Sequence, residues 1–159
     1  MQINVLAVGK LKEKYWKGAV EEYAKRLSSY AKVNVVEVPD EPTPDNASAA
    51  QEEGIKRKEA EKLLGKIGER DYVVALVIEG KSVSSEEFAG HLDKMAGQGF
   101  STFTFVIGGS LGLHECVRER ANYRLSFSKF TFPHQMVRVV LLEQVYRAMR
   151  ILRREPYHK

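Results

Sequence analysis

Two segments in the second half of the chain combine residue types that suit ligand binding, and each follows a strand-like run. The first is the glycine loop Gly108–Gly112, directly after the apolar run Phe103–Ile107. The second is Leu125–Gln135, in which serine and threonine hydroxyls alternate irregularly with phenylalanines ahead of Pro133. In open α/β sheets, ligands bind beyond the carboxyl ends of the strands. We therefore take the two segments as the candidate binding site.

The glycine loop does not match the common phosphate-binding motifs. A Walker loop needs Lys and Ser or Thr after its last glycine, but Leu113 and His114 follow Gly112. A dinucleotide-binding fingerprint joins the first strand to the first helix, whereas Gly108 follows a fourth or fifth strand. ATP hydrolysis and NAD chemistry are thus disfavoured. A plain tight turn that uses glycine to reach positive φ remains an alternative.

The segment Leu125–Gln135 fits neither a regular helix nor a regular strand. One interpretation is an ordered loop whose hydroxyls and backbone groups bind a polar edge of a ligand, while an aromatic ring covers an apolar face. The other is a buried strand followed by a helix that starts at the proline. The residues alone leave both interpretations open.

Composition limits the classes of protein to which the chain can belong. A length of 159 residues fits a single domain, residues 1–159, that can bury its own core. The formal charge of +4 favours an anionic partner such as nucleic acid. Cys116 is the only cysteine, so no internal disulfide can form, and no run has the length of a signal-peptide core or a membrane span. We expect a cytoplasmic protein without a membrane partner.

Apolar periodicity predicts strands that alternate with helices. The strands are expected at residues 3–8, 33–38, 72–78 and 103–107, and the helices at 13–27, 47–67 and from a Ser84 N-cap to Gly97. Such alternation is typical of an α/β fold with about five parallel strands and helices on both faces of the sheet.

The last predicted helix, residues 134–153, carries an apolar arc of about 200°, which is wider than one sheet covers. The simplest second cover is the same helix of another chain, so the arc favours a homodimer. Arg138 projects into the apolar arc. The opposite face carries Tyr146 and four arginines, namely Arg147, Arg150, Arg153 and Arg154.

Motifs along the whole chain resemble the family of bacterial ribosomal RNA large subunit methyltransferases H, within the SPOUT superfamily. Their order and spacing, more than any single motif, carry the resemblance. They are Gly9–Glu13, Val106–Ser110 with Gly112, Ser126–Lys129, Thr131–Gln135, Arg138 and Tyr157–Lys159.

The resemblance implies an α/β fold with a C-terminal trefoil knot and a homodimer. It also implies methyl transfer from S-adenosylmethionine to N3 of pseudouridine 1915, in helix 69 of 23S ribosomal RNA, with the assembled ribosome as the favoured substrate. Carried over by position, the residues that bind S-adenosylmethionine are Leu76, Gly108, Phe127, Ser128, Lys129, Phe130, Thr131 and Phe132.

The chemistry implied by the resemblance needs a group that accepts the N3 proton, and histidine is best tuned for this near neutral pH. His158 and His134 are the candidates, with Tyr157 as a stacking or hydrogen-bonding partner. Arg138, Arg154 and Lys159 are the candidates for contacts with RNA phosphates. A sulfonium already carries an activated methyl group, so no metal is expected, and the four histidines lack metal-ligand spacing.

Two other functions stay open at this point. One is a non-catalytic basic dimer that binds RNA through the arginine face of its last helix. The other is a SPOUT methyltransferase that acts on a different RNA target.

Overall fold

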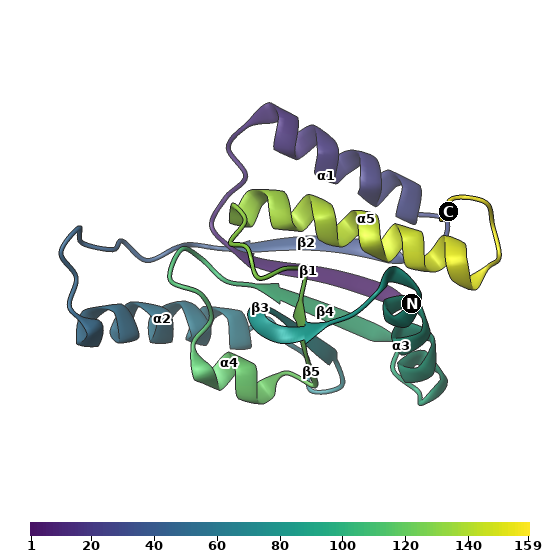
Figure 1. Ribbon diagram of the computed structural model, residues 1–159. Coiled ribbons are helices and arrows are strands. Elements are labelled where there is room, and N and C mark those ends of the chain that lie inside the picture. The colour runs from purple at the N-terminus through teal and green to yellow at the C-terminus, as the bar shows by residue number, and fades with distance from the viewer.

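A computed structural model describes residues 1–159 and places five parallel strands in the order β2-β1-β4-β3-β5 (Figure 1). The strands are β1 (Gln2–Val8), β2 (Lys32–Val38), β3 (Tyr72–Ser82), β4 (Thr102–Ile107) and β5 (Tyr123–Ser126). The helices are α1 (Lys14–Leu27), α2 (Ala49–Leu64), α3 (Ser85–Gly97), α4 (Glu115–Arg120) and α5 (His134–Leu152). The predicted α/β class with five parallel strands is confirmed.

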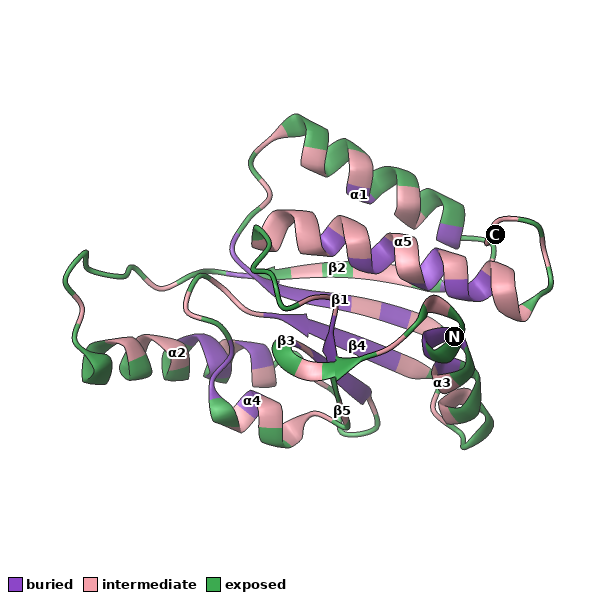
Figure 2. Cartoon of the chain, viewed as in Figure 1, coloured by how far each residue is buried: buried purple, intermediate pink, exposed green.

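Helices cover both faces of the sheet, as the sequence predicted (Figures 1 and 2). Successive residues of a strand point to opposite faces, so the central strands contribute to two cores. Ile3, Val5 and Ala7 of β1 pack with α1, α3 and α5, whereas Leu6 and Val8 pack with α2 and α4. Burial on both sides explains why residues 72–78 of β3 form an unbroken apolar run.

Capping boxes set the starts of α2 and α3. The Ser48 hydroxyl accepts a hydrogen bond from the backbone N–H of Gln51, whose side chain accepts one from the Ser48 N–H. Ser84 and Glu87 repeat this arrangement, which confirms Ser84 as the N-cap. Each box satisfies two backbone donors that a helix start leaves free.

Part of the wide apolar arc of α5 is covered within the same chain. One side of α5 lies on the sheet, and α1 and α3 flank it (Figure 1). Tyr146, which the helical projection placed on the arginine face, is buried and packs edge-to-face against Tyr30 and Tyr157. Val137, Val140, Ile151 and Leu152 of the arc stay half-buried, so the homodimer expected from the arc remains a prediction.

Strand β3 runs further than the sequence predicted, because it pairs twice with β5. Leu76 pairs with Leu125, the chain then bends, and Lys81 pairs with the same Leu125. A Cβ at Gly80, inside this bend, would lie 2.7 Å from the backbone carbon of Leu125. Only glycine lets the two backbones approach so closely.

We predict that Gly80→Ala destabilises the protein by about 2 kcal/mol or more, because the added methyl group meets backbone rather than a movable side chain. Gly90→Ala in α3 is the matched control, since its Cβ would meet nothing within 4 Å and alanine favours a helix. Denaturant unfolding measures both. Equal stability of the two variants would contradict the close crossing.

Candidate functional site

The glycine loop forms a tight turn at the carboxyl end of β4. The N–H of Gly112 donates to the carbonyl of Gly109 over 3.1 Å, and Gly112 has a φ of 83°. A Cβ at Gly108 would lie 2.8 Å from the carbonyl carbon of Gly112. Both positions therefore need glycine, one for its positive φ and the other for the close approach.

Each interpretation of the segment Leu125–Gln135 is partly correct. Strand β5, buried at Leu125 and Ser126, ends at Ser126, and α5 begins directly after Pro133. Between them lies an ordered loop held by its own hydroxyls. Ser126 Oγ donates to the carbonyl of Ser128 over 3.1 Å, and Ser128 Oγ accepts from the N–H of Phe130 over 3.0 Å.

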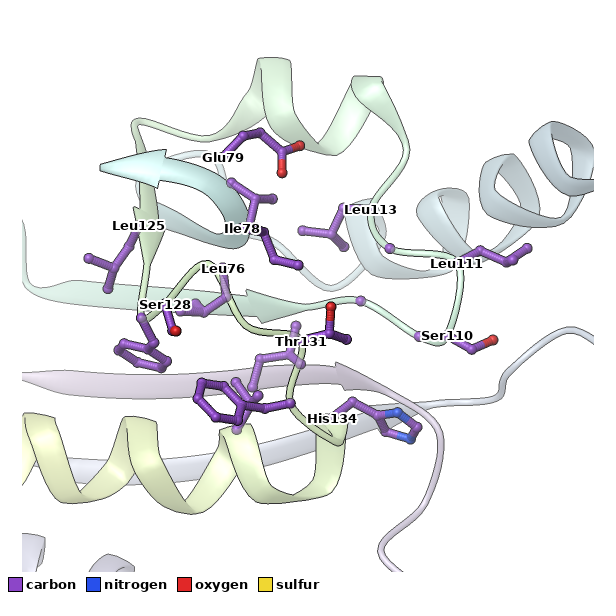
Figure 3. A pocket seen from close by; sticks show the side chains of 18 of the residues that line it. Leu76, Ile78, Glu79, Ser110, Leu111, Leu113, Leu125, Ser128, Thr131 and His134 are labelled. Carbon is purple, nitrogen blue, oxygen red and sulfur yellow. The ribbon is translucent and has the colours of Figure 1, made fainter. Parts of the chain in front are cut away.

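A cavity of about 370 Å³ lies between the glycine loop and the loop at residues 127–133 (Figure 3). Its walls come from the carboxyl ends of β3 and β4, both loops, α4 and the first turn of α5. More than half of the lining residues are hydrophobic. The size and the mostly apolar lining are those of a small-molecule site.

Seven of the eight residues predicted to bind the cofactor line this cavity, and Lys129 does not. Figure 3 places Leu76 at its centre, with Thr131 opposite the end of β4. The two candidate segments thus face one another across a single space. The lining members of the predicted set are Leu76, Gly108, Phe127, Ser128, Phe130, Thr131 and Phe132.

Charged groups at the cavity were not predicted from the sequence. Glu79 at the end of β3 forms an ion pair with Arg118 of α4, and both line the cavity. A hydrogen bond from its own backbone N–H, together with the charge of Arg118, holds the pKa of Glu79 below its usual value. Glu79 directly follows an apolar run in the sequence, and this position could have identified it as a site residue. No sequence pattern could have identified Arg118, since its position at the cavity depends on how α4 packs.

His134 lies at the start of α5 and lines the cavity. A Cβ at Gly9 would be 3.8 Å from its Nε2 atom, so the ring sits beside the end of β1. Burial lowers the pKa of His134, and the nearby Arg138 lowers it further. The imidazole is therefore neutral at pH 7, the form that can accept a proton.

Arg138 lies inside the protein, which corrects its predicted role as a phosphate contact. Its side chain has no exposed surface. One end of the guanidinium pairs with Glu37 Oε2 at 2.5 Å, and the other donates to the carbonyl of Gly9 over 3.0 Å. A guanidinium engaged in this way and shielded from solvent cannot reach an RNA phosphate. It joins α5 to β2 and to the end of β1.

The tail residues lie at the other end of α5 from the cavity of their own chain. A 19-residue helix is about 28 Å long, and His134 begins it while Tyr157 follows it. The Tyr157 hydroxyl donates to Glu143 over 3.1 Å, and His158 Nε2 is 2.6 Å from Glu86 Oε1. Within one chain, the structure therefore separates Tyr157, His158, Arg154 and Lys159 from His134 and the cavity.

No group of three or more His, Cys, Asp or Glu side chains is arranged to hold a metal ion. No helix has the length and apolar character needed to cross a membrane.

Comparison with known proteins agrees with the geometry of the cavity. A family model described as "Predicted SPOUT methyltransferase" matches residues 1–158. The chain belongs to the SPOUT methyltransferase family. The chain is 60% identical to "Ribosomal RNA large subunit methyltransferase H" of Clostridium botulinum strain 657 / Type Ba4, and 58% identical to the protein of that name in strain Langeland / NCTC 10281 / Type F. Both alignments cover all of both chains, and the resemblance found in the sequence is thereby confirmed.

We predict that Glu37→Gln destabilises the protein by about 3 kcal/mol at neutral pH, because it leaves the Arg138 charge buried without its partner. This value is at the lower end of the free-energy cost of breaking a buried ion pair, since a third of the Glu37 side chain is exposed.

The effect of this substitution should depend on pH. Burial raises the pKa of Glu37, but hydrogen bonds from Arg138 and the Leu11 N–H outweigh it and leave the pKa below its usual 4.5. The pair's contribution is thus complete above pH 4.5 and is lost as the pH falls through the folded-state value. Unfolding curves of the two proteins should converge in acid, and a constant difference would argue against the ion pair.

Proposed function

We propose that the protein is an S-adenosylmethionine-dependent methyltransferase that methylates N3 of pseudouridine 1915 in helix 69 of 23S ribosomal RNA. The assembled ribosome in the cytoplasm is the proposed substrate. One observation carries the proposal: the glycine loop and the loop at residues 127–133 enclose one cavity, in a chain of the SPOUT methyltransferase family. The name of the relatives supports the ribosomal substrate.

The residues around the cavity fit S-adenosylmethionine. Leu76 and Leu113 offer apolar cover, and the close packing of Gly108 on the Gly112 backbone sets the shape of the glycine loop that lines the cavity. The ion pair of Glu79 and Arg118 places a carboxylate and a guanidinium at the same cavity, which suits a ligand that carries charged groups of both signs. When bound, S-adenosylmethionine supplies a sulfonium with an activated methyl group. The chain then needs mainly to hold donor and acceptor in line.

The acceptor nitrogen carries a proton that must leave, and two histidines are candidates to take it. His134 lines the cavity and is neutral at pH 7. His158 is in contact with Glu86 and Arg147, at the far end of α5. A role for both in one active site requires that the tail come from another chain.

We therefore also propose a homodimer in which the tail of one subunit completes the cavity of the other. The separation of the tail from its own cavity supports this arrangement, and so do the apolar residues of the α5 arc that stay half-buried. In such a dimer, Tyr157 and His158 of the tail face the target base, while Arg154 and Lys159 contact phosphates.

A C-terminal trefoil knot is the proposed topology of the cavity region. The double pairing of Leu125 with Leu76 and Lys81 supports it, because the bend within β3 passes closely around β5. The contact at Gly80, where the two backbones nearly touch, lies in the same bend.

Binding of S-adenosylmethionine separates this enzyme from a non-catalytic RNA-binding dimer. We expect isothermal calorimetry to detect binding, and Gly108→Arg to weaken it at least about 100-fold, because the new side chain would clash with the Gly112 backbone and distort the glycine loop. Gly54→Arg on α2, where a Cβ meets nothing within 4 Å, is the matched control. Absence of binding, or binding unaffected by Gly108→Arg, would rule out the proposed pocket.

Mapping the methylated nucleotide on ribosomes and on free 23S RNA tests the target.

Deleting Tyr157–Lys159 should abolish methylation and leave donor binding intact, since the cavity of each chain lies at the other end of α5. Mixing this variant with Gly108→Arg tests whether the site is shared. Each variant alone is inactive, but a mixed dimer combines one intact cavity with the intact tail of the other chain. Recovery of activity on mixing supports the shared site, and failure to recover it after subunit exchange contradicts it.

A further inference from the structure

The turn between β1 and α1 carries a concentration of positive charge that none of the proposed roles uses. Residues 9–17 contain four lysines and one glutamate, against a net charge of +4 for the whole chain. Lys10, Lys12, Lys14 and Lys17 are all exposed. None of them forms an ion pair, so their charges are available to a partner.

Hydrogen bonds hold this turn on both sides of Lys10, and the one at Gly9 is buried. The Arg138 guanidinium donates to the carbonyl of Gly9, and the N–H of Leu11 donates to Glu37 Oε2 over 2.8 Å. Arg138 and Glu37 pair with each other, so the turn is fixed to α5 and β2 at once. Lys10 and Lys12 thus project from a backbone with little freedom, which lowers the entropy lost when they bind a ligand.

The turn also adjoins the cavity. A Cβ at Gly9 would lie 3.8 Å from the ring of His134, which lines the cavity, and Figure 3 shows this ring beside the end of β1. A nucleotide whose base entered the cavity would keep its own phosphates outside, near the rim. Lysines contact phosphates without reading sequence and so set the position of a strand.

We propose that residues Gly9–Lys12 form a phosphate-binding turn, in which Lys10 and Lys12 contact RNA phosphates next to the target nucleotide. The proposal rests on the RNA methyltransferase function above and adds an RNA contact from the same chain that supplies the cavity. The buried Arg138 serves this contact indirectly, as a positioning residue for the turn.

The test compares Lys10→Gln/Lys12→Gln with wild type in methylation of ribosomes that lack the modification, over a range of salt concentrations. We expect KM for ribosomes to rise roughly tenfold and the slope of log KM against log salt to fall by about 1.5, as for two lost phosphate contacts. The kcat at saturating ribosomes and the affinity for S-adenosylmethionine should stay within about twofold of wild type.

Two controls separate a local contact from a general effect of charge. Lys25→Gln/Lys32→Gln removes the same charge from exposed, unpaired lysines at the far end of α1 and the start of β2, and should leave KM unchanged. Lys10→Arg/Lys12→Arg keeps both charges and should restore most of the binding.

An unchanged KM and salt slope in the Lys10→Gln/Lys12→Gln protein would overturn the phosphate-binding turn, and so would equal losses in the Lys25→Gln/Lys32→Gln protein. A fall in kcat without a change in KM would also overturn it. If wild type itself fails to methylate ribosomes, the proposed function falls and this inference with it. That result differs from the others because it appears before any lysine is changed.

Discussion

The arrangement of the site depends on one buried ion pair, between Arg138 and Glu37. Arg138 is the largest fully buried side chain of the protein. A buried guanidinium is costly unless it is paired and hydrogen-bonded, so α5 must lie where Glu37 of β2 and the Gly9 carbonyl can both be reached. His134, one helical turn earlier, is thereby fixed beside the end of β1. The start of α5 and the turn after β1 consequently form one unit at the rim of the cavity.

Glycine contacts impose the second constraint, because they decide how closely the loops of the cavity approach one another. Gly108 touches the backbone of Gly112, and Gly80 touches that of Leu125. At each position a methyl group would push two backbone segments apart and change the shape of the space between them. The cavity is therefore defined by backbone packing, while its side chains supply apolar cover.

The length of helix α5 separates the two candidate proton acceptors, His134 and His158. Its first turn carries His134 at the cavity, and the chain beyond its last turn carries Tyr157 and His158. Glu143 accepts hydrogen bonds from Arg147 and Tyr157, which holds the tail against the helix. A site that uses both ends of α5 must combine two chains. The proposed homodimer follows from this separation.

Sequence determined the parts of the structure that depend on local patterns. Alternation of apolar strands with amphipathic helices predicted the parallel sheet with helices on both faces, and Ser84 marked the start of α3. The motifs around Gly108 and Phe127 correctly indicated two segments that meet at one cavity. These features were predictable because strand burial, helix capping and turn formation depend on residues that are neighbours in the sequence.

Tertiary structure alone decided which distant side chains meet. Arg138 was placed in the apolar arc of its helix from the sequence, yet its partner Glu37 is 101 residues away, so its structural role could not be inferred. Arg118 reaches Glu79 only because α4 packs beside β3, and α1 and α3 cover part of the α5 arc for which the sequence suggested a second chain. Such contacts depend on how elements pack across the sheet, and local sequence patterns do not record that packing.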